Sequence, residues 1–457
     1  MTIATQSELV STNPATGDPV GQVAVTALDE ISSLFKRSRA AQMTWASRSL
    51  EDRVEILSRV IPILESRIDV IGKLVTDEMG KPLQEGIGEV RYGVEGLQSQ
   101  LDSMADALKP QTLDDGTTHS VMYHDPYGVC VAITPWNFPF LMPLQIVLPA
   151  LVAGNSVIMK PSELVPLVGQ QFADAFNEVL PPDLLMVVHG ADDQGKALVA
   201  GDCDFIGFVG SREAGQHILS TAGRDLKRVV LELGGKDPMI VLKDADLEAA
   251  AKFAVRNSFR NCGQVCVSTE RIYVEDEIAQ AFENEVVRQT EALIVGNGAD
   301  ETTQIGPMVS HTQKEMVLAQ LEQAKRDGAR VVCGDEPMEG NFVRPTVLAD
   351  LNHEMGIMRD ETFGPLACIM RVSNSDEAVQ LANDTPFGLG AAVFGDQEAE
   401  AVGRALGAGM IGINQGCGGA SGTPWVGAHQ SGYGFHSGVD GHRQFAQVRV
   451  VSRPCSD

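Results

Sequence analysis

Two cysteines share one short polar segment. Cys262 and Cys266 lie four residues apart in NSFRNCGQVC, residues 257–266. A thiolate is a strong nucleophile, although a lone cysteine is more often a small buried apolar residue. The residues GQV that precede Cys266 indicate a tight approach of the backbone to a ligand, which favours Cys266 as the nucleophile. No C-x-x-C pair or histidine cluster accompanies the cysteines, so no metal site is expected.

Two further segments carry groups that could assist a thiol. Glu232 ends an apolar run and precedes two glycines, so a buried carboxylate of raised pKa could act there as a general base. Asn137 lies within PWNFP, residues 135–139, where a rigid backbone could aim an N–H group at an oxyanion. Taken singly, an exposed strand-end carboxylate and a turn asparagine are the simpler interpretations.

Two other segments are candidate nucleotide sites. Gly210 and Ser211 follow an apolar run and precede a helical pattern, which would turn N–H groups and a hydroxyl towards a phosphate. KPSE, residues 160–163, ends another apolar run and could bind ribose hydroxyls. Serine capping of a helix and an exposed proline turn explain each segment more simply when it is taken alone. The G-x-G-x-x-G fingerprint is absent after the early strands.

The segments that must position these residues alternate between short apolar runs and helical stretches. Apolar runs lie at 129–133, 156–159, 184–188, 205–209, 229–233 and 239–242, and helices are expected at 141–153 and 165–179. This alternation predicts a parallel, doubly wound sheet with ligands at the carboxyl ends of its strands. A second alternating stretch runs from Ala245 to about Gly412. The chain before Pro110 is mainly helical in pattern, interrupted at Pro62, and 111–127 is expected to be an extended arm.

Composition excludes several classes of function. The chain has 457 residues, 44% of them apolar, and a net charge of −26. A surface this acidic argues against nucleic-acid and membrane partners. Eight scattered cysteines and an N-terminus without a basic and apolar leader predict a reducing, cytoplasmic location.

Taken together, the segments resemble the aldehyde dehydrogenase superfamily over nearly the whole chain. The resemblance rests on five segments in family order: PWNFP (135–139), KPSE (160–163), ELGGK (232–236), GQVC (263–266) and ETFGP (361–365). It implies an α/β, aldehyde dehydrogenase-like fold with two doubly wound parallel-sheet domains plus a small β oligomerisation arm. The implied NAD-binding Rossmann-like domain comprises 1–109 and 128–234, and the catalytic domain comprises 235–425. The arm comprises 110–127 and 440–457, including Tyr123 and QVRVVS (447–452), and implies a homodimer or homotetramer.

The resemblance also implies roles for individual residues. Cys266 would attack the aldehyde, Asn137 and the Cys266 N–H would hold the oxyanion, and Glu232 would activate water to release the acid. The implied NAD-binding residues are Lys160, Ser162, Glu163, Gly210, Ser211, Glu361, Phe363 and Trp136. Because a carboxylate pairs with a 2′-hydroxyl and repels a 2′-phosphate, Glu163 favours NAD, with NADP possible but less favoured.

The substrate tunnel is implied to contain Phe138, Gln145, Val265, Val267 and Trp425, together with the small-residue loop 416–421. No arginine occurs among these positions, which favours an uncharged aliphatic or aromatic aldehyde. The segment 424–436 departs from the family pattern: Trp425 stands for a phenylalanine and His436 for a glutamate.

Three alternatives stay open. A CoA-acylating enzyme would pass the acyl group to CoA, but such enzymes often lack the glutamate found at 232. A cysteine hydrolase or acyltransferase without nicotinamide needs a histidine base, and none of the nine histidines lies in a suitable motif. A binding protein without activity has no need of Asn137, Glu232, Cys266 and Glu361 together.

Overall fold

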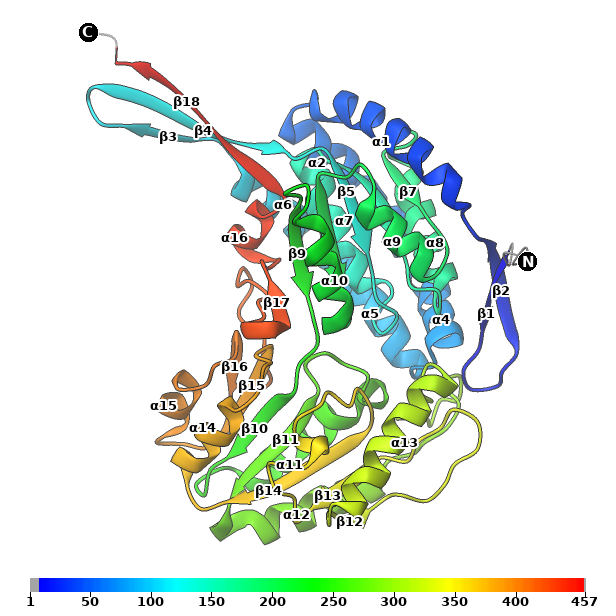
Figure 1. The fold of residues 1–457 in the computed structure, drawn as a ribbon, viewed down its shortest axis with the longest axis vertical. Coiled ribbons are helices and arrows are strands. Elements are labelled where there is room, and N and C mark those ends of the chain that lie inside the picture. Colours follow the sequence, from blue (N-terminus) through cyan, green and yellow to red (C-terminus); the bar gives the residue numbers. More distant parts are fainter. Residues whose placement is uncertain (1–7, 456–457) are drawn as a thin grey trace.

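Two sheets, both mostly parallel, organise the chain (Figure 1). The computed structural model describes residues 8–455. The first sheet has the strand order β17-β9-β8-β5-β6-β7. Its strands are β5 (Val129–Ile133), β6 (Ser156–Lys160), β7 (Leu185–Val187), β8 (Phe205–Val209), β9 (Arg228–Glu232) and the short antiparallel β17 (Gly432–Tyr433). From β5 the chain moves outward in both directions, so a ligand crevice is expected where β5 and β8 end side by side.

Helices cover both faces of this sheet. The N-terminal hairpin β1 (Glu8–Thr12) and β2 (Pro19–Ala24) precedes a series of helices. They are α1 (Ile31–Ala46), α2 (Leu50–Ser58), α3 (Val60–Glu65), α4 (Ile68–Met79), α5 (Leu83–Glu95) and α6 (Leu97–Leu108). The connections between strands contain α7 (Leu141–Ala153), α8 (Pro166–Asn177), α9 (Asp192–Ala200) and α10 (Arg212–Ala222).

The second sheet has the order β12-β13-β14-β11-β10-β15-β16, with β12 antiparallel at one edge. Its strands are β10 (Asp237–Val241), β11 (Thr269–Glu275), β12 (Arg330–Cys333), β13 (Thr346–Ala349), β14 (Leu366–Val372), β15 (Gly390–Phe394) and β16 (Met410–Ile413). The helices around it are α11 (Leu247–Phe259), α12 (Asp276–Glu291), α13 (His311–Arg326), α14 (Ser375–Asn383) and α15 (Ala399–Arg404). Phe259, Tyr273 and Phe282 are fully enclosed in its core.

A third, three-stranded sheet projects from the rest of the molecule (Figure 1). It joins β3 (Gln111–Asp114) and β4 (Thr118–Pro126) to β18 (Ala446–Pro454), which follows α16 (Gly438–Arg443). Leu113, Val448, Val450 and Val451 are apolar and exposed on these strands.

The expected α/β architecture is confirmed, and the strands at 129–133 and 205–209 and the helix at 141–153 match the expected ranges. The interruption near Pro62 also occurs: α2 ends at Ser58 and α3 begins at Val60. Pro62 has no N–H to donate to the Ser58 carbonyl, so the helix breaks one turn before the proline. The hairpin β1–β2 was not expected in a segment read as mainly helical.

Within residues 8–455, no helix is both long and apolar enough to cross a membrane. No group of three or more histidine, cysteine, aspartate or glutamate side chains in that range is placed to hold a metal ion.

Candidate active site

A cavity of about 1100 Å³ lies between the two large sheets. Asn137 reaches it from the loop after β5, and Glu232 is the last residue of β9. Cys266 reaches it from the loop before β11, and Glu361 from the loop before β14. The site therefore combines the carboxyl ends of strands in the first sheet with the amino ends of strands in the second.

The loop before Cys266 has an unusual backbone. Asn261, Cys262 and Gly263 all have positive φ, at 53°, 57° and 71°. Such left-handed conformations are costly for residues other than glycine and occur often at active sites. A contact within the protein requires glycine at 263, which the sequence had indicated as a point of close approach to a ligand. A Cβ at Gly263 would overlap the carbonyl group of Gly364, so this glycine lets two protein loops touch.

Buried amides hold the Asn137 side chain against this loop. Asn137 Nδ2 donates to the Gln264 carbonyl at 3.1 Å, and Asn261 Nδ2 donates to the same carbonyl at 3.1 Å. The Gln264 side chain accepts from the Val309 N–H at 2.9 Å. Because an amide nitrogen carries two hydrogens, Asn137 keeps a second N–H for a ligand near Cys266.

Glu232 and Cys266 lie together in apolar surroundings. Glu232 is 4% exposed, and within residues 8–455 neither carboxylate oxygen has a hydrogen-bond partner. Burial raises the pKa of Glu232 to about 7, and the nearby side chains of Cys266 and Trp425 partly oppose this. Burial and the adjacent Glu232 carboxylate raise the pKa of the Cys266 thiol well above its usual range. The resting thiol is therefore protonated beside a base that titrates near neutrality.

The other end of the cavity has polar groups suited to a nucleotide. Gly210 and Ser211 line it at the start of α10, where the Ser211 hydroxyl accepts from the Ala214 N–H at 3.3 Å. Glu361 accepts a hydrogen bond from the Gly235 N–H at 3.0 Å. Trp136 and Phe363 also line the cavity, with their ring centroids 5.4 Å apart in an edge-on arrangement.

KPSE lies at the carboxyl end of β6, beside the end of β5. Lys160 is 4% exposed and its Nζ lies 3.5 Å from Glu163 Oε2. Ser162 is also buried, and its hydroxyl accepts from the Leu164 N–H at 3.3 Å. These three residues are not part of the cavity lining, although they share the same edge of the sheet.

The five implied tunnel residues all line the cavity: Phe138, Gln145, Val265, Val267 and Trp425. The loop 416–421 does not, although Cys417 packs in the same apolar cluster as Cys266. His436 and Ser437 also line the cavity, and the Ser437 hydroxyl donates to Gln145 Oε1 at 2.9 Å. The atypical 424–436 segment thus reaches the site.

Three arginines line the cavity that were not expected there from the sequence: Arg212, Arg256 and Arg260. Arg256 and Arg260 reach it from the end of α11, together with Glu85 of α5. Within the described chain, no hydrogen bond satisfies the buried Arg260 Nε. The expectation of an uncharged substrate rested on a tunnel without cations, and the cavity does contain them. The proximity of Arg260 to Cys266 in sequence was the available signal.

Comparison with known proteins agrees with this geometry. The model of the aldehyde dehydrogenase family matches residues 2–451. The chain belongs to this family. Among the curated relatives of this aldehyde dehydrogenase, peroxisomal aminoaldehyde dehydrogenase 1 from Pisum sativum is 35% identical over 97% of this chain and 92% of its own. An NADP(+) succinate-semialdehyde dehydrogenase from Deinococcus radiodurans is 34% identical over 96% of this chain and 93% of its own.

Solved structures also resemble this aldehyde dehydrogenase. A betaine aldehyde dehydrogenase from Staphylococcus aureus, crystallised with NAD+, has a TM-score of 0.94 and 28% identity, covering 98% of this chain and 94% of its own. An aldehyde dehydrogenase from Brucella melitensis has a TM-score of 0.95 and 31% identity, covering 100% of this chain and 96% of its own.

Proposed function

We propose that this aldehyde dehydrogenase oxidises an aldehyde to the carboxylic acid with NAD+, using Cys266 as the nucleophile. The observation that carries the proposal is the convergence of Cys266, Glu232 and Asn137 on one cavity that extends to Gly210 and Glu361. A thiol, a base of suitable pKa, an oxyanion donor and a nucleotide-binding end are the parts that this reaction needs.

In the first half of the reaction, Glu232 accepts the thiol proton and the Cys266 sulfur bonds to the aldehyde carbon. The free Asn137 N–H and the Cys266 backbone N–H donate to the resulting oxyanion. Removing one donor of this kind typically lowers turnover by about 100- to 1000-fold. Loss of hydride from the bound substrate leaves a thioester on Cys266. Glu232 releases the thiol proton to solvent and, as a carboxylate again, takes a proton from water, which attacks the thioester carbon. The C–S bond then breaks, the acid leaves, and Glu232 returns its proton to the Cys266 sulfur.

The residues at the nucleotide end fit NAD+. Gly210 packs closely against the Phe208 ring, where a Cβ would collide with it, and the start of α10 offers backbone N–H groups to a phosphate. Gly210 and Ser211 would hold the pyrophosphate, Glu361 the nicotinamide ribose, and Trp136 and Phe363 would flank that end. When bound, NAD+ accepts the hydride.

Lys160, Ser162 and Glu163 are proposed to hold the adenosine ribose. Glu163 lies beside Lys160, and Asp192 is close enough to influence the Lys160 pKa. Two carboxylates at this position would repel a 2′-phosphate, so NAD is preferred over NADP. The relative from Deinococcus radiodurans is named for NADP(+), and NADP use stays possible here.

Arg256 and Arg260 favour an aldehyde that carries an anionic group at its far end. Glu85 lines the cavity beside these two guanidinium groups, and burial raises the pKa of its carboxyl group. Relatives from Deinococcus radiodurans and Arabidopsis thaliana are named for succinate semialdehyde, which is such a substrate. Arg260→Gln should therefore raise KM for succinate semialdehyde by about tenfold or more, the value of one lost charged hydrogen bond, and leave KM for propanal unchanged. Equal changes for both aldehydes would contradict this assignment.

The proposed domains are an NAD-binding domain (1–109 and 128–234), a catalytic domain (235–425) and an oligomerisation arm (110–127 and 440–457). β17, at 432–433, joins the first sheet from outside these ranges. We also propose a homodimer or homotetramer in the cytoplasm. All eight cysteines are free thiols, as expected in a reducing compartment.

The nucleophile is tested by replacing each of the two neighbouring thiols. Cys266→Ala should abolish NADH formation from any aldehyde while NAD+ still binds, measured by fluorescence titration. Cys262→Ala is the matched control. Cys262 lies four residues before Cys266 and is fully buried, so turnover should not depend on its thiol. Substantial turnover by Cys266→Ala would overturn the proposal. Release of free acid without CoA separates this reaction from the acylating alternative.

A further inference from the structure

The loop that carries Glu361 and Phe363 is irregular and strained. Phe363 has a φ of 51°, a left-handed conformation that costs a residue with a side chain roughly 1 kcal/mol or more. Burial and the nearby charge of Glu270 raise the pKa of Glu361 to about 8. A loop with these features keeps its shape only if surrounding groups hold it.

Glu270 provides that support from the second residue of β11. Its side chain is 3% exposed. Glu270 Oε2 accepts from the Thr362 N–H at 2.7 Å, and Oε1 accepts from the Phe363 N–H at 2.8 Å. One carboxylate therefore binds two consecutive backbone N–H groups of the strained loop. Bonds to a charged acceptor are the stronger kind of hydrogen bond, especially where water is excluded.

Lys236 completes the arrangement from the turn that follows Glu232. Its ammonium group is fully buried and donates to Glu270 Oε2 at 2.7 Å and to the Thr362 hydroxyl at 3.1 Å. The Gly235 N–H donates to Glu361 in the same turn. The segment carrying the proposed base and the loop carrying the proposed nicotinamide ligand are thus joined by buried polar contacts.

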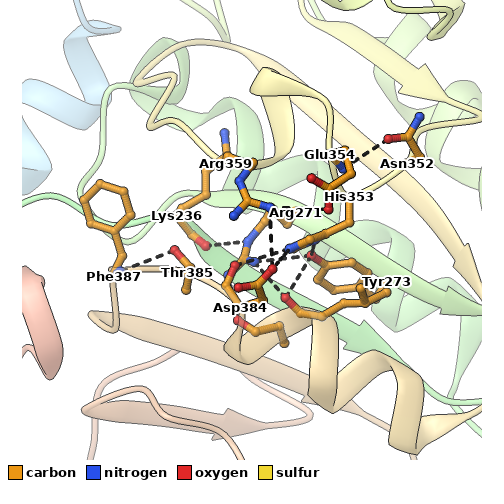
Figure 2. Close-up of polar contacts among 12 residues, drawn as sticks. Lys236, Arg271, Tyr273, Asn352, His353, Glu354, Arg359, Asp384, Thr385 and Phe387 are labelled. Atoms are coloured by element: carbon orange, nitrogen blue, oxygen red, sulfur yellow. Dashed lines mark hydrogen bonds and ion pairs between the residues drawn. The ribbon is translucent and has the colours of Figure 1, made fainter.

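The opposite face of β11 holds the main chain of Lys236. Arg271 Nε donates to the Lys236 carbonyl at 2.8 Å, and its other nitrogens donate to the carbonyls of Leu381 and Ala382 (Figure 2). Because successive side chains of a strand point to opposite faces, Glu270 binds the Lys236 ammonium on one face of β11 and Arg271 binds the Lys236 carbonyl on the other. Lys236 is therefore held both by its side chain and by its backbone carbonyl.

Glu270 and Lys236 lie outside the cavity lining, and their side chains are 3% and 0% exposed, because each is enclosed by the loops that it joins. We propose that Glu270, neutralised by Lys236, is a positioning residue that sets the cofactor loop 361–363 for hydride transfer. This inference rests on the proposed function, because it assigns the loop to the nicotinamide end of NAD+. It predicts that disturbing Glu270 impairs the hydride step more than the thiol chemistry at Cys266.

Glu270→Gln tests the proposal with a side chain of nearly the same volume. If the amide oxygen takes the place of Oε2, it still accepts from the Thr362 N–H and Lys236, but the NH2 group then faces the Phe363 N–H and that hydrogen bond is lost. Misplacement of a reacting group by about 1 Å costs about 100-fold, so kcat for aldehyde oxidation should fall about 10- to 100-fold. The isotope effect on kcat with aldehyde deuterated at C1 should rise as hydride transfer becomes limiting.

A reaction without NAD+ supplies the discriminating readout. Hydrolysis of p-nitrophenyl acetate needs Cys266 and Glu232 but not the cofactor loop, so Glu270→Gln should keep a rate close to that of the wild type. Glu270→Asp retains the charge and should recover part of the lost oxidation. Glu283→Gln is the matched control: Glu283 is a buried carboxylate of the same region, 3.1 Å from Arg330, and its loss should leave the ratio of the two activities unchanged.

Two results would overturn the proposal, and they are distinguishable from each other. If oxidation and ester hydrolysis fall in parallel in Glu270→Gln, the role of Glu270 is merely structural. If Glu270→Gln does not fold, the same comparison is made with Glu270→Asp. If the wild-type enzyme forms no NADH with any aldehyde, the proposed function fails and the positioning role fails with it.

Discussion

Burial is what makes Glu232 a usable base near neutral pH. Its pKa of about 7 means that the carboxylate form, which can accept a proton, predominates only above that pH. Turnover should therefore rise with pH through about 7 and fall about tenfold for each unit below it, as expected for a single required base. A pH profile of kcat measures this directly. A midpoint near the ordinary value of 4.5 would show that Glu232 is not the limiting base.

The same burial predicts a cost in stability. Because the folded-state pKa of Glu232 is raised above 4.5, its contribution to stability is fully present below pH 4.5 and is lost as the pH rises through about 7. Above that range the charged carboxylate destabilises the fold by up to about 3 kcal/mol, at 1.36 kcal/mol per unit of pKa. Glu232→Gln, though inactive, should therefore exceed the wild type in Tm at pH 8.5 by more than at pH 5.5. A gap that does not depend on pH would contradict this prediction.

At the residue scale, local pattern alone left Glu232 and Asn137 as a strand-end carboxylate and a turn asparagine, and only the resemblance of five segments in order assigned them to a site with Cys266. The structure places all three around one cavity. Glu270 and Arg260 were missed because their importance comes from contacts made across the fold. Glu270 binds backbone groups some ninety positions away, and no local pattern indicates that pairing.

At the scale of elements, hydrophobic runs were enough to place most strands of the first sheet. β17 could not be foreseen, since it is two residues long and pairs with β9 from about two hundred positions away. The cavity lies at the carboxyl ends of the strands in the first sheet only. Cys266 and Glu361 precede β11 and β14, because the second domain presents the amino ends of its strands to the cavity.

One buried ion pair joins two helices to the turn that bears Asn137. Lys81 donates to Glu89 at 2.7 Å and to the Asn137 carbonyl at 2.8 Å. Glu89 in turn accepts from the N–H groups of Phe140 and Leu141 at the start of α7. The pair thus holds the backbone of the turn that bears Asn137, the proposed oxyanion donor.

Removing one partner of this pair should destabilise the fold because it leaves the other charge buried without a partner. Lys81→Met should destabilise the protein by about 3–5 kcal/mol, as measured for one-sided losses of buried pairs, and the Lys81→Met, Glu89→Gln double variant should recover part of it. Lys73→Met is the control, because Lys73 pairs with Asp77 on the surface of α4 and should cost less than about 1 kcal/mol. Urea unfolding of the four proteins gives the comparison. Equal losses for Lys81 and Lys73 would contradict the assigned role.

At the scale of the molecule, the cavity shares the acidic excess of a chain whose net charge is −26. Its lining contains six carboxyl groups and four cationic side chains, the cations being Lys81, Arg212, Arg256 and Arg260. An anionic ligand must therefore be bound by local contacts, and the net charge opposes the approach of two copies of the chain.

The projecting sheet is the surface at which we expect a second copy to bind. Val448, Val450 and Val451 are 52%, 59% and 54% exposed on β18, on both faces of a ribbon too thin to bury them itself. Packing against a second copy would cover them, so we expect a homo-oligomer by sedimentation velocity. Val450→Lys should shift the mass towards the monomer, whereas Val70→Lys, on α4 and 66% exposed, should leave it unchanged. Because like charges oppose association and salt screens them, assembly should strengthen as ionic strength rises towards about 0.15 M. A wild-type monomer under these conditions, or equal masses for both variants, would show that the arm serves another purpose.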